Sequence, residues 1–186
     1  MNNTMLARLQ YWFSQLLTRI HLDQAAIAQL RLAVAADPRY AKAWRSLGFM
    51  LGTREEKEEA INVLEHALTI EDDAITRFNL GYLYHGQKRT SEAIAQFRRV
   101  VTLMPLNDRA WYGLGTCLQD AGDFAASVAP LEEAAKLQYF NPHAGYHLAL
   151  AWHKLGERDK CTAEFERVKS FDPRMAETME RDFGRQ

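Results

Sequence analysis

A pattern recurs along this chain of 186 residues at intervals of 33 to 34 residues. The units that carry it begin near Ala41, Ala74, Asp108 and Pro142, and a further unit fits upstream from Ala7. Trp-x2-Leu-Gly occurs near the start of two units, at Trp44 and at Trp111. A period of this length is typical of one supersecondary unit repeated in tandem, so it restricts the chain to a repeat array.

Each unit then carries a small residue, an apolar residue four positions later and a small residue three positions after that. These triplets are Ala60-Leu64-Ala67, Ala93-Phe97-Val100, Ser127-Leu131-Ala134 and Cys161-Phe165-Val168. Residues four apart lie on the same face of a helix, so the triplet predicts a second helix in each unit that packs through one face. Small residues in the first helix, such as Gly48, Gly81 and Gly115, indicate where the two helices approach closely.

These features resemble the tetratricopeptide repeat, whose period is 34 residues and whose signature runs W-x2-L-G-x2-Y, then A-x3-F, then P. The resemblance covers roughly residues 7–175. It implies an all-α, right-handed α-solenoid of five helix-turn-helix repeats in a single domain over residues 1–186. The repeats are expected at residues 7–40, 41–73, 74–107, 108–141 and 142–175, with a capping helix at 173–183 whose polar side chains shield the last repeat.

The same resemblance implies a protein-interaction scaffold or adaptor without enzymatic activity, which binds a peptide or a helical segment in a concave groove. In this family the first helix of each repeat lines the groove. The residues expected to bind the partner are Lys42, Arg45, Phe49, Phe78, Asn79, Tyr82, His85, Arg109, Tyr112, Tyr146 and His153. Aromatic and basic side chains dominate this set, which favours aromatic anchoring of a partner that carries carboxylates.

Some members of the family hold acidic chaperone tails in a carboxylate clamp of five residues. Arg45, Asn79 and Arg109 match three clamp positions, but Phe49 and Gly113 stand at the other two, so the clamp is incomplete. Residues 110–150 also resemble the tetratricopeptide chaperones of type III secretion, through Leu114-Gly115-Thr116-Cys117 and Tyr146-His147-Leu148-Ala149. A secretion chaperone and a regulatory fragment of a larger enzyme are therefore the alternative functions.

Composition narrows the function further. The formal net charge of −1 argues against a general nucleic-acid binder. Two cysteines, Cys117 and Cys161, lack a CxxC partner, which favours buried reduced thiols and a cytoplasmic protein. The N-terminal residues do not form a convincing signal peptide, and no apolar stretch is long enough to insert into a membrane. The chain could still be one piece of a longer protein.

The sequence contains no motif for phosphate binding, nucleophilic catalysis or zinc hydrolysis, so we expect no cofactor and no catalytic residue. His143 and His147 stand four residues apart and could chelate a metal, but positions of this kind in the repeat usually face the groove or pack nearby. We therefore expect no metal site.

The N-terminal helix is strongly amphipathic. Its apolar arc consists of Met5, Leu6, Leu9, Trp12, Phe13, Leu16, Leu17 and Ile20. We expect this arc to pack on the next helix, with self-association as the second interpretation and binding to a membrane surface as the third. Two local features are also predicted: a capping box formed by Thr53 and Glu56, and a helix kink at Pro130.

Overall fold

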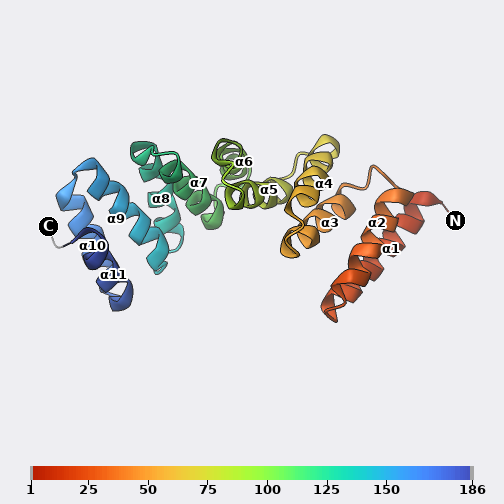
Figure 1. Cartoon of the computed structure of the whole chain (residues 1–186), viewed down its shortest axis with the longest axis horizontal. Helices are drawn as coiled ribbons and strands as arrows, with labels where there is room; N and C mark the ends of the chain where they lie inside the picture. Colours follow the sequence, from red (N-terminus) through yellow and green to blue (C-terminus); the bar gives the residue numbers. More distant parts are fainter. Residues whose placement is uncertain (1, 185–186) are drawn as a thin grey trace. The chain divides into compact units, whose positions relative to one another are not determined.

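The computed structural model of the protein describes residues 2–184, and helices are the only regular secondary structure in this range (Figure 1). In chain order the helices are α1 (Asn3–Arg19), α2 (Asp23–Ala36), α3 (Ala41–Thr53), α4 (Lys57–Ile70), α5 (Ala74–Gly86), α6 (Thr90–Leu103), α7 (Asp108–Asp120), α8 (Phe124–Leu137), α9 (Pro142–Leu155), α10 (Arg158–Lys169) and α11 (Pro173–Phe183). The chain divides into two compact units, Met1–Gln87 and Lys88–Gln186, called here the N-terminal and C-terminal units. The predicted all-α class is confirmed.

The helices begin where the sequence period places the repeats. The first helices of the last four repeats start at Ala41, Ala74, Asp108 and Pro142. In the first repeat, α1 starts at Asn3, before the expected Ala7, because the side chain of Asn2 accepts a hydrogen bond from the Thr4 amide. The expected capping helix over residues 173–183 is α11.

Short polar side chains fix several of these starts. Asp73 accepts hydrogen bonds from the amides of Ile75 and Thr76, and Asn107 accepts one from Ala110. Such caps satisfy amides in the first turn that have no partner within the helix. Asn141 and Asp172 cap the two helices that open with proline, α9 and α11.

The predicted capping box at Thr53 is wrong. Thr53 is the last residue of α3, and its hydroxyl donates a hydrogen bond to the carbonyl of Met50. The next helix, α4, begins at Lys57 after Glu56, with no capping hydrogen bond from a side chain. The hydroxyl of Thr53 is therefore used by the end of one helix and does not serve the start of the next.

The recurring tryptophan of the repeat has a defined hydrogen-bond partner. The indole Nε1–H of Trp44 donates to the carbonyl of Pro38 at 2.9 Å, and that of Trp111 donates to the carbonyl of Pro105 at 2.8 Å. In both repeats the acceptor lies six residues upstream, in the loop that precedes the helix. The tryptophan thereby joins the start of each repeat to the loop that enters it.

Close helix packing explains the glycines in the repeat signature. A Cβ atom added at Gly48 would lie 2.5 Å from Leu64 Cγ, and one added at Gly115 would lie 2.5 Å from Leu131 Cγ. Leu64 and Leu131 are fully buried, so neither can move aside without disturbing the core. The predicted approach of paired helices at these small residues is confirmed.

Pro130 is buried within α8, and the helix continues on both sides of it from Phe124 to Leu137. Whether the helix bends there stays a prediction. Both cysteines are buried, as expected. Burial and the nearby Asp120 raise the pKa of the Cys117 thiol to about 12, and burial also raises the pKa of Cys161.

The expectation for the N-terminal helix is wrong. α1 packs on α2 through small residues, since Ala7 and Ser14 are the buried side chains of the helix. Six large apolar side chains of the predicted arc are exposed instead: Met5, Leu9, Trp12, Phe13, Leu16 and Ile20. Around a helix these six lie opposite Ala7 and Ser14. The small side chains therefore determine which face meets α2, and the large ones point away from it.

Candidate functional site

The N-terminal unit contains a cavity of about 280 Å³ between the first helices of its repeats, α1, α3 and α5. Its lining residues are Gln15, Thr18, Arg45, Ser46, Phe49, Met50, Ile75 and Asn79. Three of them, Arg45, Phe49 and Asn79, belong to the groove predicted from the sequence. This concave site is called here the α3 pocket.

Large apolar side chains at the α3 pocket remain open to solvent. Phe49 is 55% exposed and Ile75 is 52% exposed, although both lie in helices that bury other apolar residues. Exposed side chains of this size at a concave site provide contact area for an apolar group of a partner. Farther along α5, the rings of Phe78 and Tyr82 meet edge to face at a centroid distance of 4.9 Å.

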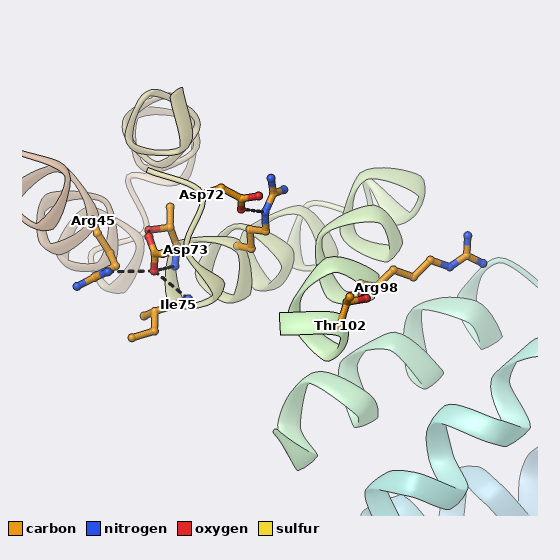
Figure 2. A network of polar contacts seen from close by, with 8 residues as sticks. Arg45, Asp72, Asp73, Ile75, Arg98 and Thr102 are labelled. Atoms are coloured by element: carbon orange, nitrogen blue, oxygen red, sulfur yellow. Dashed lines mark hydrogen bonds and ion pairs between the residues drawn. The ribbon is translucent and has the colours of Figure 1, made fainter. Parts of the chain in front are cut away.

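Arg45, which was expected to meet carboxylates of a partner, is already paired within the protein. Its Nη1 lies 2.9 Å from Oδ1 of Asp73 (Figure 2). The same carboxylate caps α5 by accepting hydrogen bonds from the amides of Ile75 and Thr76 and from the Thr76 hydroxyl. One aspartate thus starts α5 and neutralises the arginine of the preceding repeat.

The protonation of Asp73 follows from these contacts. Burial acts to raise its pKa, but the hydrogen bonds from Thr76 and the positive charge of Arg45 together outweigh burial, so the pKa lies below its ordinary value. The ion pair is therefore formed at neutral pH. Asp73 was not predicted as a site residue, although its place immediately before a predicted helix start was a signal for a capping residue.

A second cavity of the N-terminal unit, about 500 Å³, is lined by three basic residues. It is lined by Arg8, Arg39, Tyr40, Ala41, Lys42, Ile70 and Glu71. Among the described residues, the side chains of Arg8, Arg39 and Lys42 form no ion pair, and all three are exposed. Lys42 is a predicted groove residue, and unlike Arg45 it has no acidic partner within the described structure.

One aromatic ring, that of Tyr40, lines this basic cavity, and it contacts the ring of Tyr11. Tyr11 and Tyr40 meet edge to face at a centroid distance of 5.3 Å. Burial raises the pKa of Tyr40, with a further contribution from Tyr11, so its hydroxyl stays protonated at neutral pH. A protonated phenol beside three cations can donate a hydrogen bond to an anionic group.

In the C-terminal unit, the predicted groove residue Tyr112 lies beside His147, with ring centroids 5.5 Å apart. The imidazole of His147 is held by Gln119, whose Oε1 lies 2.7 Å from Nδ1 and whose Nε2 donates to the His147 carbonyl at 2.7 Å. His143, four residues earlier, is exposed. Residues 2–184 contain no group of three His, Cys, Asp or Glu side chains arranged to hold a metal ion.

Two other predicted groove residues contact the terminal helix. The Tyr146 hydroxyl donates to Oδ2 of Asp182 at 2.9 Å, and the Phe183 ring lies 5.7 Å from that of Tyr146 and 5.5 Å from that of His153. α11 therefore covers this part of α9. The remaining predicted residues lie on α5, where His85 is half-buried, and on α7, where Arg109 is exposed.

The two clamp matches in the N-terminal unit, Arg45 and Asn79, line the same pocket, while the third, Arg109, lies in the C-terminal unit. No helix in the described part of the chain has the length and apolar character needed to cross a membrane.

Comparison with known proteins agrees with the architecture. Residues 80–135 match the family model described as tetratricopeptide repeat. The tetratricopeptide repeat-containing protein trd-1 of Caenorhabditis elegans is 28% identical over 143 residues, or 76% of this chain. The chain spans only 18% of the length of that relative.

Several solved structures share the fold. YrrB, described as a tetratricopeptide-repeat protein with an unusual peptide-binding site, matches with a TM-score of 0.84 at 19% identity, covering 92% of this chain and 90% of YrrB. MamA of Desulfovibrio magneticus RS-1 matches with a TM-score of 0.82 at 17% identity, covering 90% of this chain and 95% of MamA. PilF of Pseudomonas aeruginosa matches with a TM-score of 0.75 at 20% identity, covering 98% of this chain and 89% of PilF. The resemblance inferred from the sequence is confirmed.

Proposed function

Since the chain is a tetratricopeptide-repeat protein, with a fold that supports protein–protein interaction, we propose that it binds a short segment of a partner protein in the α3 pocket. The observation that carries this proposal is the pairing of a cavity with two exposed apolar side chains, Phe49 and Ile75, at its lining. A buried apolar anchor surrounded by polar groups is the usual centre of a protein interface. The peptide-binding site described for YrrB, which has the same fold, is consistent with this role.

The partner segment is proposed to carry an apolar side chain that enters the α3 pocket and carboxylates that meet Arg8, Arg39 and Lys42. These cations have no acidic partner in the described structure, so they can contribute attraction to an incoming acidic segment. The paired Arg45 contributes less, because a ligand carboxylate would have to compete with Asp73. The role is that of a non-enzymatic scaffold or adaptor.

The first experiment identifies the partner by affinity purification of the full chain and mass spectrometry, and then measures affinity for a synthetic segment of that partner. Phe49→Ala should weaken binding at least about tenfold, the scale of an interface anchor. Phe140→Ala is the matched control, since Phe140 is 74% exposed but lies outside the pocket, and it should change the affinity less than about twofold. Equal affinity of all three proteins would contradict the proposed site.

Charge reversal tests the second part of the proposal. Arg8→Glu combined with Lys42→Glu should slow association and reduce its salt dependence, because exposed charges are screened over about 8–10 Å at physiological ionic strength. Arg98→Glu on α6 is the control, since Arg98 is exposed on the other unit. Arg45→Glu is unsuitable, because it would place a second carboxylate beside Asp73 and disturb the fold.

A further inference from the structure

The outward face of α1 has no counterpart among the other first helices of the N-terminal unit. Its exposed side chains, called here the α1 face, are Met5, Leu9, Trp12, Phe13, Leu16 and Ile20, each between 42% and 64% exposed. No charged residue interrupts the set, and Trp12 and Phe13 meet edge to face at its centre, 5.6 Å apart. An apolar patch of this length on a surface usually marks an interface.

The repeat register shows what kind of surface this is. In the second repeat, the positions equivalent to Leu9, Phe13 and Leu16 are Ala43, Leu47 and Met50. Those three residues are buried in the core cluster that contains the inward side chains of α2. The α1 face therefore occupies the positions that, one repeat later, pack against a neighbouring helix.

The side chains of the α1 face are larger than those of its equivalent in the second repeat. Leu9 stands where the second repeat has Ala43, and Trp12 stands where it has Ser46. The small residues let α3 approach α2 closely, whereas leucine and tryptophan keep a facing helix farther away. The α1 face is thus suited to a helix that packs at a wider spacing than a neighbouring repeat.

The order of the six residues is symmetric along the helix. Counted from the midpoint between Trp12 and Phe13, Leu9 is matched by Leu16 and Met5 is matched by Ile20. When two copies of such a helix pair in antiparallel orientation about a twofold axis at that midpoint, each apolar side chain is level with an apolar side chain of the other copy. Self-complementarity of this kind is what a twofold dimer interface requires.

We propose that the α1 face binds the α1 face of a second copy of this chain, in an antiparallel twofold dimer with Trp12 and Phe13 at its centre. The six side chains expose apolar area on the order of 600 Å² per copy, which gives a total near the lower end of stable interfaces. The opposite end of the chain does not offer an alternative surface, because the outward side of α11 carries the exposed charged residues Arg174, Glu177 and Arg181.

The charges on α1 distinguish a second copy of the chain from other possible partners of the α1 face. α1 contains two cations, Arg8 and Arg19, and no carboxylate. They lie toward one edge of the face, and antiparallel pairing places Arg8 of one copy near the level of Arg19 of the other. Salt screens this repulsion, so dimerisation should strengthen as salt rises. A partner with anionic lipid headgroups or an acidic helix would bind more weakly as salt rises.

Sedimentation velocity of the full chain, at concentrations up to about 100 μM, measures the association directly, since interfaces of this size often have micromolar or tighter dissociation constants. The wild-type protein should dimerise, and Leu9→Glu combined with Leu16→Glu should weaken the dimer at least about 100-fold, because it places four charges in the contact. Leu106→Glu is the matched control, since Leu106 is 81% exposed outside the α1 face, and it should leave the dimer unchanged. Circular dichroism should show all three proteins folded.

Crosslinking tests the orientation. A short bismaleimide should join a Leu9→Cys chain to a Leu16→Cys chain in a mixture and should join neither variant efficiently to itself, because antiparallel pairing places Leu9 level with Leu16 of the other copy. Cys117 and Cys161 are buried, so they should not contribute crosslinks of their own. Efficient crosslinking within the Leu9→Cys protein alone would overturn the antiparallel arrangement. A wild-type chain that stays monomeric at all concentrations, or a monomer that binds anionic vesicles through the same leucines, would overturn the proposal.

Discussion

The two terminal helices, α1 and α11, are both amphipathic, but they use their apolar residues in opposite ways. α11 turns Ala176 and Met179 inward, where Met179 is 0% exposed in a cluster with Cys161 and Val168, and presents charged residues outward. α1 turns Ala7 and Ser14 inward and presents its largest apolar residues outward. An amphipathic pattern therefore does not reveal which face is buried, because the fit against the neighbouring helix decides it.

The same comparison separates stability from recognition. A terminal helix that buries its apolar residues stabilises the last repeat, as capping helices do in repeat proteins. A terminal helix that exposes its apolar residues gains little folding stability from their apolar area, and that area remains accessible to another molecule. Substitutions on α11 should therefore lower the stability of the fold, whereas equivalent substitutions on the α1 face should alter association and leave stability unchanged.

The largest difference in the free energy of unfolding is expected between the variants Met179→Ala and Trp12→Ala. Met179→Ala leaves a cavity under α11 and should lower the free energy of unfolding by about 2–5 kcal/mol. Trp12→Ala removes a larger side chain but should change it by less than about 0.5 kcal/mol, because the side chain is exposed. Urea unfolding of dilute protein measures both values, and similar losses for the two variants would remove the contrast between the helices.

The rate of thiol labelling measures how easily α11 opens, separately from unfolding of the whole chain. Cys161 lies in the cluster that α11 covers, whereas Cys117 is buried in α7 and its raised pKa suppresses the thiolate. Met179→Ala should speed labelling of Cys161 at least about tenfold, since 1.4 kcal/mol of easier opening corresponds to that factor. Trp12→Ala should leave the labelling rates of both cysteines unchanged. Equal acceleration of both thiols would indicate global unfolding instead of release of α11.

A smaller difference in stability is expected between variants that remove the N-terminal cap of α11 and the N-terminal cap of α1. Asp172 accepts a hydrogen bond from the Met175 amide at 3.0 Å, and Asp172→Ala should cost about 1 kcal/mol. Asn2 accepts one from the Thr4 amide at 3.4 Å at an exposed end, so Asn2→Ala should cost less than about 0.5 kcal/mol. Thermal unfolding of both variants checks this order, and a larger loss from Asn2→Ala would reverse it.

The smallest effect is a pH dependence in the docking of α11 on α9. Burial and the hydrogen bond to Asp182 raise the pKa of Tyr146, so its contribution to docking of α11 is complete below about pH 10 and is lost as pH rises through the raised pKa. The hydrogen bonds from Tyr146 and Arg181 lower the pKa of Asp182, so its contribution is present above about pH 3.9 and is lost as pH falls through the lowered value.

Trp152 packs against the buried cluster that contains Met179, so its fluorescence should report both transitions of α11. Tyr146→Phe should abolish the alkaline transition and keep a folded protein. The α1 face has no titratable side chain, so self-association should not follow the same two transitions. An alkaline change that persists in Tyr146→Phe would assign it to another group.

Much of the fold could be predicted because its signals are local. The spacing of Trp44 and Trp111, the glycines at helix contacts and the small-apolar-small triplets of the second helices placed the helices close to their observed bounds. The concave site was predicted less completely. Phe49 and Asn79 do line one pocket, but the partner of Arg45 was not anticipated, because Asp73 lies 28 residues away and is brought near only by packing of successive repeats.

The sequence by itself determined the period, the helix pairs and the family, since each depends on residues within one turn or one repeat of each other. Only the tertiary structure decided which charges are neutralised and which face of α1 remains uncovered. An ion pair depends on the distance between two helices, and burial depends on how closely a neighbour fits, and neither quantity is set within a single helix. For α1, the small side chains Ala7 and Ser14 allowed the closest contact with α2, and the large apolar side chains were left outside.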